Sequence, residues 1–266
     1  MNPVIQTLSL ILISLTLVSL ALSTAVLRRR ERRSSAIPLR DIEAFSVIPQ
    51  MVGLSVESDR PLLLSTGGAQ LGGEQTLIAL AGAELAYYLA RETAVGQTVP
   101  IFLTSDVSTL PLGYDTLRRA YKLRELPNRS GFTHARWYPA GSRSLVYAAM
   151  MTTTLHSDQI SGGVLVGNFG SELALVLASS IRRGIPIMAG TDDLTGTAIV
   201  YAMSDGALLG ENVFAASGYI GDRLSQRASI FAMDFLRVTV IIIILLITLQ
   251  QTAADFVRFV VDGLLR

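Results

Sequence analysis

Cysteine is absent from the 266-residue sequence, which excludes disulfides, thiolate zinc sites, iron–sulfur clusters and cysteine nucleophiles. Histidine is scarce, and the two present, His134 and His156, lie far apart and leave little for a histidine metal site. The net charge is only +1, and no stretch combines a broad basic face with interleaved aromatic residues. These absences predict no metal, no cofactor and no nucleic-acid partner.

Catalytic motifs are missing as well. Neither histidine lies near a serine elbow of the GxSxG type. A catalytic triad would have to bring its three partners together from distant segments. We therefore predict no catalytic residues and favour a protein that is not an enzyme; an enzyme stays the third hypothesis, which turnover abolished by substitution of Asp192 or Glu172 would promote.

Charged residues make up only 16% of the chain and hydrophobic residues 50%, and the apolar excess collects near the two ends. Residues 4–27 carry no charge and would form a helix of about 36 Å, enough to cross a bilayer core. Residues 238–254 are also uncharged and reach the lower limit for a span, about 17 residues. We predict one transmembrane helix at 1–27 and a second within a long helix at 222–266.

A run of arginines follows the first apolar segment, whereas a signal peptide carries its positive charge before the apolar region. The positive-inside rule places these arginines in the cytoplasm, and Arg223, Arg227 and Arg237 before the second segment agree. The sequence thus predicts a cell-membrane protein with a cytoplasmic middle and both termini outside. Binding of anionic lipid is the other reading of the run, which comprises Arg28, Arg29, Arg30, Arg32 and Arg33.

Two features of the terminal segments suggest neighbours in the membrane. Ser9, Thr16 and Ser23 recur at intervals of seven, a small-residue stripe that favours helix packing, unless each hydroxyl bonds its own i−4 carbonyl. Residues 255–266 are amphipathic, which suits either an interfacial helix or packing on a neighbour.

The middle of the chain alternates strand-like and helix-like segments. After a basic flank and linker at 28–38, residues 39–221 predict a cytoplasmic α/β domain with a Rossmann-like, mostly parallel sheet and right-handed crossovers. The expected strands are 62–65, 100–104, 135–138, 163–167 and 185–189, and the expected helices are 74–93, 114–126, 145–155 and 171–183.

An internal sequence similarity suggests that this domain has two related αβ halves. Residues 82–90 and 170–178 share the pattern Gly-x-Glu-Leu-Ala-x-x-Leu-Ala, and each is followed by Pro-Ile and then by a hydroxyl–Asp pair. Duplication and chance similarity between alanine- and leucine-rich helices both remain open. The similarity would make Glu84 and Glu172 equivalent, either as paired carboxylates or as polar positions of a repeat.

Ligands of open α/β sheets bind beyond the carboxyl ends of the strands. The turn at 167–172 runs into a helix N-terminus that could hold a phosphate or carboxylate, but it has neither a Walker A nor a dinucleotide pattern. The alternative is a tight turn with Ser171 as helix cap and Glu172 beside the helix dipole. Asp192 and Asp193 suit a cap better than a calcium loop. The candidate ligand-binding residues are Gly67, Gly68, Asn168, Gly170, Ser171, Glu172, Thr191 and Asp192.

Three motifs, at residues 163–172, 189–192 and 208–220, resemble a family of uncharacterised bacterial membrane proteins whose domain has no known function. The resemblance covers most of the chain. It implies an α/β domain between two transmembrane helices and supplies no reaction. Within the third motif, residues 211–221 alternate small and aromatic side chains, which favours close packing between the domain and its membrane segment, with a ligand role as the alternative.

These observations lead to two functional hypotheses. The first is a membrane-anchored, non-enzymatic scaffold or assembly protein that self-associates into a homo-oligomer in the bilayer, with other membrane subunits as further candidate partners. The alternative is a membrane-tethered module that binds a small anion or nucleotide at the carboxyl ends of the parallel strands.

Overall fold

The computed structural model describes residues 42–126, 129, 131–220 and 237–241, together with Ser14, Ala25 and Thr248. The chain divides into two compact units. One is the α/β domain, Arg40–Gly221, and the other combines Met1–Leu39 with Asp222–Arg266.

The predictions for the terminal segments fall almost entirely outside the described residues. This holds for the two spans, the arginine run and the Ser9–Thr16–Ser23 stripe, apart from Ser14, Ala25, 238–241 and Thr248. Within the described parts of the chain, no helix is both long enough and apolar enough to cross a bilayer.

A six-stranded sheet forms the centre of the α/β domain, and every neighbouring pair of strands is parallel. The strand order, β3-β2-β1-β4-β5-β6, is that of a doubly wound dinucleotide-binding fold, with its switch point between β1 and β4. The predicted α/β class is confirmed, and the sheet is wholly parallel. The strands are β1 (Leu62–Gly67), β2 (Ile101–Thr104), β3 (Ala135–Trp137), β4 (Gly162–Asn168), β5 (Ile187–Thr191) and β6 (Gly206–Leu208).

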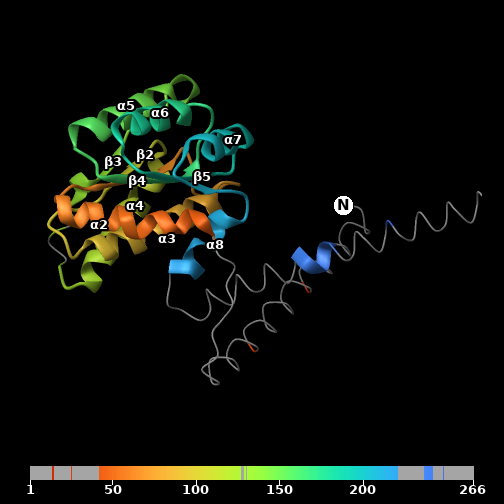
Figure 1. Ribbon diagram of the computed structural model, residues 1–266, viewed down its shortest axis with the longest axis horizontal. Coiled ribbons are helices and arrows are strands. Elements are labelled where there is room, and N and C mark those ends of the chain that lie inside the picture. Colours follow the sequence, from red (N-terminus) through yellow and green to blue (C-terminus); the bar gives the residue numbers. More distant parts are fainter. Residues whose placement is uncertain are drawn as a thin grey trace, which may run out of the picture. The chain divides into compact units, whose positions relative to one another are not determined.

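Helices cover both faces of this sheet (Figure 1). One layer contains α2 (Val47–Ser58), α3 (Thr76–Thr93), α4 (Leu110–Leu123) and α8 (Asn212–Ile220). The other contains α5 (Leu145–Ser157), α6 (Leu173–Arg183) and α7 (Leu194–Met203). Short 3₁₀ segments are η1 (Glu43–Ser46), η2 (Val107–Thr109), η3 (Phe132–His134) and η4 (Ser142–Ser144).

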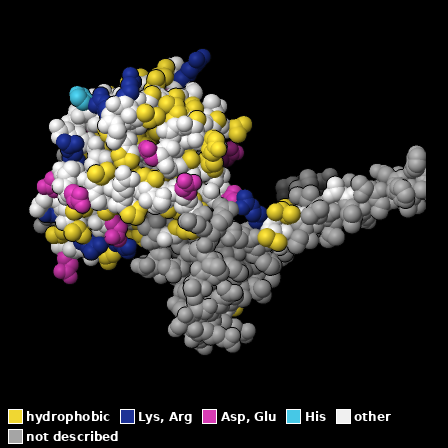
Figure 2. All heavy atoms as spheres, viewed as in Figure 1, with side chains coloured by type: hydrophobic (Ala, Val, Ile, Leu, Met, Phe, Trp, Pro, Cys, Tyr) yellow, Lys and Arg dark blue, Asp and Glu magenta, His cyan; other side chains and the backbone are white. Residues whose placement is uncertain are grey.

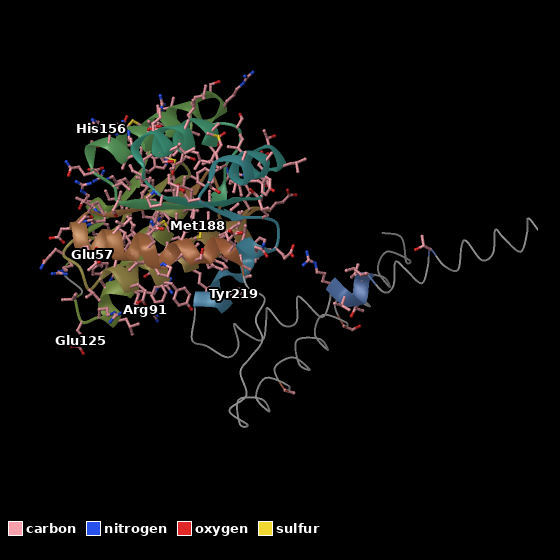
Figure 3. All side chains as sticks on the ribbon, viewed as in Figure 1. Glu57, Arg91, Glu125, His156, Met188 and Tyr219 are labelled. Atoms are coloured by element: carbon pink, nitrogen blue, oxygen red, sulfur yellow. The ribbon has the colours of Figure 1, made fainter. Side chains whose placement is uncertain are left out.

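The central strands are buried on both faces, because helices lie above and below them. Every residue of β1 is buried, and so are the first six residues of β4. This explains why both strands read as continuous apolar or small-residue runs rather than as alternating patterns. Met188 of β5 lies in the interior of the domain and is fully buried (Figure 3).

Two glycines let backbones approach closely, one between a helix and the sheet and one between two neighbouring strands. A Cβ atom on Gly82 of α3 would lie 2.2 Å from the carbonyl oxygen of Val166, so α3 rests directly on the backbone of β4. A Cβ atom on Gly167 would lie 1.9 Å from the carbonyl oxygen of Thr66. Any larger side chain at either position would force the backbones apart.

The two similar segments, 82–90 and 170–178, do not occupy equivalent positions in the structure. Residues 82–90 lie wholly inside α3, whereas Gly170, Ser171 and Glu172 precede the first residue of α6. Glu84 is therefore mid-helix and Glu172 is at a helix start, so the predicted equivalence of the two carboxylates is wrong. The chain does form two β-α-β-α-β runs, β1–β3 and β4–β6, and duplication itself stays a prediction.

Candidate functional site at the carboxyl edge of the sheet

β1 and β4 close against each other at the switch point. The Gly68 N–H donates to the Asn168 carbonyl oxygen at 2.9 Å. Gly67 has a φ of +59°, and a Cβ atom there would lie 2.3 Å from the same oxygen, so glycine is required at this position. A Cβ atom on Gly68 would lie 3.5 Å from both Asn168 Oδ1 and Ser105 Oγ. Polar groups from three strand ends thus converge around Gly68.

The ends of β4 and β5 are joined by side-chain hydrogen bonds. Asn168 Nδ2 donates to Asp192 Oδ1 at 2.9 Å. Thr191 Oγ1 accepts from the Phe169 N–H at 3.0 Å and bonds the Phe169 carbonyl oxygen at 2.9 Å. The structure thereby brings together five of the eight predicted residues: Gly67, Gly68, Asn168, Thr191 and Asp192.

The remaining three residues form the turn before α6. The Gly170 N–H donates to Glu172 Oε1 at 2.8 Å, and Glu172 is only 9% exposed. This carboxylate lies at a helix N-terminus, the position that would attract a bound anion. Ser171 is exposed, and Glu172 rather than Ser171 directly precedes the helix and makes no side-chain cap. The predicted Ser171 cap is wrong because the Glu172 side chain folds back onto the turn instead.

Two further helix starts at this edge are capped by the chain's own carboxylates. Asp193 Oδ2 accepts from the Gly196 N–H at 2.8 Å at the start of α7, which confirms a cap in the Asp192–Asp193 pair. Asp106 Oδ1 accepts from the Ser108 N–H at 2.8 Å at the start of η2. With Glu172, these carboxylates place negative charge where the N-termini would otherwise attract an external anion.

Trp137 and Ser105 also belong to this edge, although neither was among the predicted ligand-binding residues. Trp137 Nε1 donates to the Ser105 carbonyl oxygen at 3.0 Å, and the indole is 42% exposed at the end of β3. The preceding residue of β3, Arg136, pairs with Asp158 at 2.7 Å. Burial by itself lowers the pKa of Arg136, but the hydrogen bond and charge of Asp158 raise it overall. The strand-like segment at 135–138 was the sequence signal that could have found Trp137.

A buried polar pair supports the end of β1 from within. Ser65 Oγ lies 2.7 Å from Tyr147 Oη of α5 and accepts from the Gly67 N–H at 3.0 Å. Burial raises the pKa of Tyr147, because the phenolate would lose its hydration, and the hydrogen bond from Ser65 only partly offsets this. The next residue, Thr66, is also buried, and its Oγ1 has no hydrogen-bond partner among the described residues.

Neither histidine lies at this edge. His134 ends η3, before β3 begins, and its Nδ1 lies 3.3 Å from the Gly131 backbone. His156 is exposed near the end of α5 (Figure 3). Across the described stretches, no group of three or more histidine or acidic side chains is placed to hold a metal ion.

Two of the domain's cavities, both lined by described residues, lie away from this edge. The larger, about 400 Å³, lies where η1, the end of α7 and β6 meet. The smaller, about 170 Å³, lies between α3 and α8 and is lined by Leu77, Leu80, Ala81, Glu84, Val213 and Phe214. None of the eight predicted ligand-binding residues lines either cavity.

Together these features define a doubly wound α/β domain whose carboxyl edge is held by hydrogen bonds among its own polar groups. Residues 4–261 match the family described as a domain of unknown function (DUF6754), and the chain belongs to this family. No curated protein and no solved structure matches the chain. The resemblance to an uncharacterised family is therefore confirmed, while the family's bacterial origin and membrane helices stay predictions.

Proposed function

We propose that this chain is a membrane-anchored, non-enzymatic assembly protein that self-associates into a homo-oligomer. The observation that carries the proposal is the exposure of large apolar side chains on helical surfaces of the α/β domain, since such patches mark interaction sites. One patch comprises Leu77 and Leu80 of α3 with Phe214 of α8. The other is the outer α7 face, which comprises Leu194, Ala198, Tyr201 and Ala202.

The carboxyl edge supports this proposal indirectly. Enzymes and binding modules of this fold leave polar groups at the switch point for their ligand. Here the side chains of Asn168, Asp192 and Glu172 are already bonded within the chain. A role that uses the outer surfaces of the helices fits this arrangement better than chemistry at the strand ends.

The membrane part of the proposal rests on sequence. Two uncharged segments at 4–27 and 238–254, each with arginines on the side that faces the intervening domain in the sequence, suit a cytoplasmic domain and external termini. Membranes washed with alkaline carbonate should retain the protein, and protease added to intact cells should leave the domain uncut. Release by carbonate would contradict the anchors, and cleavage in intact cells would contradict the orientation.

Self-association is tested on the full chain extracted in mild detergent. Mass photometry should give a particle mass that is a multiple of the 28.6 kDa chain, after correction for detergent. Dilution should reveal the dissociation constant. A monomer at every concentration would overturn the proposal.

A small-anion or nucleotide-binding module is the second candidate, favoured by the convergence beside Gly68 of the Asn168 and Ser105 side chains, whose amide and hydroxyl groups can donate hydrogen bonds. Inorganic phosphate and ATP are the probes, and thermal unfolding is followed through the single tryptophan, Trp137. For a binding module, the probe should raise the melting temperature of the parent, and Asn168→Ala should abolish the effect. Thr153→Ala, at an exposed position of α5 outside the eight candidate residues, is the matched control. No stabilisation by either probe would leave the assembly role as the better account.

A further inference from the structure

The outer α7 face is uncharged along its whole length. Leu194 is 86% exposed and Tyr201 74% exposed, and Ala198 and Ala202 are exposed between and beside them. No residue from Leu194 to Met203 carries a charge. Figure 2 shows hydrophobic side chains gathered on the surface over α6 and α7. Leu175 of α6, which is also exposed, extends the apolar surface toward the neighbouring helix.

A cavity opens at one end of this face. The space of about 400 Å³ is lined by Tyr201 and Ser204 from the end of α7, by residues of β6 and by η1. Tyr201 therefore belongs both to the exposed face and to the cavity wall. The same surface carries protruding side chains and a hollow, as a self-complementary contact requires.

Charges of opposite sign lie at the two ends of this surface. Because α6 and α7 each connect parallel strands, both run from the carboxyl edge back to the amino edge. Asp192 and Asp193 precede α7 at the carboxyl edge, whereas at the amino edge Arg182 and Arg183 end α6 and outnumber Asp205, which follows α7. A twofold axis through the middle of α7 would bring the acidic end of one copy toward the basic end of the other.

We infer that the outer α7 face is a twofold interface between two copies of this chain, with the axis near Ala198. This inference rests on the proposed function and names the surface that performs it. Each copy places Tyr201 against the other's α7, and Asp192 faces Arg183 of the partner. The small side chains of Ala198 and Ala202 let the two helices approach closely at the axis.

The charges favour a second copy over a lipid surface. Anionic lipid attracts basic residues, but Asp192, Asp193 and Asp205 lie at the two ends of α7. A ten-residue helix is also only about 15 Å long, so this contact alone covers less than the ~800 Å² per partner of a standard interface. Joint anchoring in one membrane compensates by making the contact effectively intramolecular.

The absence of cysteine makes the test direct. Ala198→Cys in the full chain, in native membranes, is oxidised with copper phenanthroline and resolved without reductant. A covalent dimer is expected, because a disulfide needs Cα atoms within about 7 Å. The matched control is Arg119→Cys on α4, which is exposed on the opposite face of the sheet and should stay monomeric. No dimer at Ala198→Cys, or a covalent adduct only with a different protein, overturns the inference.

Charge reversal separates this inference from the proposed function. Arg183→Glu should raise the dissociation constant measured by mass photometry at least tenfold, and adding Asp192→Arg in the same chain should restore it. If the parent forms oligomers that Arg183→Glu leaves unchanged and Ala198→Cys does not cross-link, the α7 interface is wrong while self-association stands. A monomeric parent overturns both. The thermal unfolding of each variant, read from Trp137, identifies any variant that loses association through misfolding, and the cysteine cross-link then decides.

Discussion

At the carboxyl edge of the sheet, polar side chains are bonded to one another, whereas on the outer α7 face apolar side chains are exposed to solvent. Asn168 is paired with Asp192, and Glu172 with the backbone of its own turn. Leu194 and Tyr201, by contrast, are largely exposed. The carboxyl edge, which usually binds ligands in this fold, is occupied by hydrogen bonds within the chain. The outer α7 face, which usually binds nothing, is exposed to solvent.

The difference shows that the usual ligand site of a fold need not be the surface through which a particular chain binds a partner. Polar residues at strand ends are ligand candidates only while their hydrogen bonds are unmade. Exposed apolar side chains have no such internal alternative, and burial against a partner lowers their free energy. Substitutions of the buried residues should therefore change the free energy of unfolding strongly. Substitutions on the outer α7 face should change it little.

The largest effect is expected where α3 rests on β4. Gly82→Ala should lower the free energy of unfolding by about 3 kcal/mol, because its Cβ would meet the Val166 carbonyl oxygen at 2.2 Å. The same substitution at Gly53, in the interior of α2, meets nothing within 4 Å. Gly53→Ala should therefore stabilise by about 0.5–1 kcal/mol through helix propensity. Urea unfolding read from Trp137 measures both, and changes of the same sign would refute the close contact.

Adjacent hydroxyls at the end of β1 should respond in opposite directions. Ser65→Ala removes the hydroxyl that bonds the buried Tyr147 hydroxyl and the Gly67 N–H, which should cost about 2 kcal/mol. Thr66→Val removes a buried hydroxyl that has no described partner and should stabilise by about 1 kcal/mol. The same unfolding measurement applies. A loss of stability for Thr66→Val would mean that its hydroxyl has a partner after all.

The central strands and the residues at the carboxyl edge were largely predictable from sequence. Apolar and small-residue runs predicted β1 and β4, and the rule that ligand groups follow strand ends brought Asn168, Asp192 and Gly68 to one place. What could not be predicted is the bonding between them. The Glu172 carboxylate turns back onto Gly170, and this depends on a side-chain conformation that no pattern of residue types specifies.

α7 and β6 were not predicted from sequence, and the reasons are physical. α7 contains Gly196 and several β-branched residues, so its sequence has low helix propensity. The helix forms because Asp193 caps it and because it packs so closely on the turn after β4 that a Cβ on Gly196 would lie 2.1 Å from the Phe169 carbonyl oxygen. The edge strand that follows, β6, is Gly206-Ala207-Leu208, which has no β-branched or aromatic residue to indicate a strand. Both elements are determined by tertiary contacts.

Alkaline pH should destabilise the closed interior through Tyr121. This residue of α4 is buried and donates to the Thr98 carbonyl oxygen at 3.2 Å, and burial raises its pKa to about 12. An unfolded tyrosine has a pKa of about 10. Between pH 10 and 12 the unfolded chain therefore binds fewer protons than the folded chain, so its free energy of unfolding falls as pH rises. The contribution is intact below pH 10 and is lost toward pH 12.

The measurement is urea unfolding at half-unit steps from pH 9 to pH 11.5. Tyr121→Phe should flatten the pH dependence by up to about 1.4 kcal/mol for each pH unit in this window. The parent and Tyr121→Phe should agree in slope below pH 10. An identical slope for both proteins above pH 10 would show that Tyr121 ionises equally in the folded and unfolded states.

The smallest effect on stability is expected on the outer α7 face. Leu194→Ser and Tyr201→Ser remove side chains that are 86% and 74% exposed, so each should change the free energy of unfolding of dilute, dissociated protein by less than about 0.5 kcal/mol. Under the proposed self-association, the same substitutions should lower the melting temperature of the concentrated full chain, because they would weaken an association that stabilises the fold by mass action. The comparison of dilute and concentrated samples carries the test. A large loss in the dilute protein would mean that these side chains stabilise the single chain, and that the difference between the two regions of the molecule is smaller than their exposure suggests.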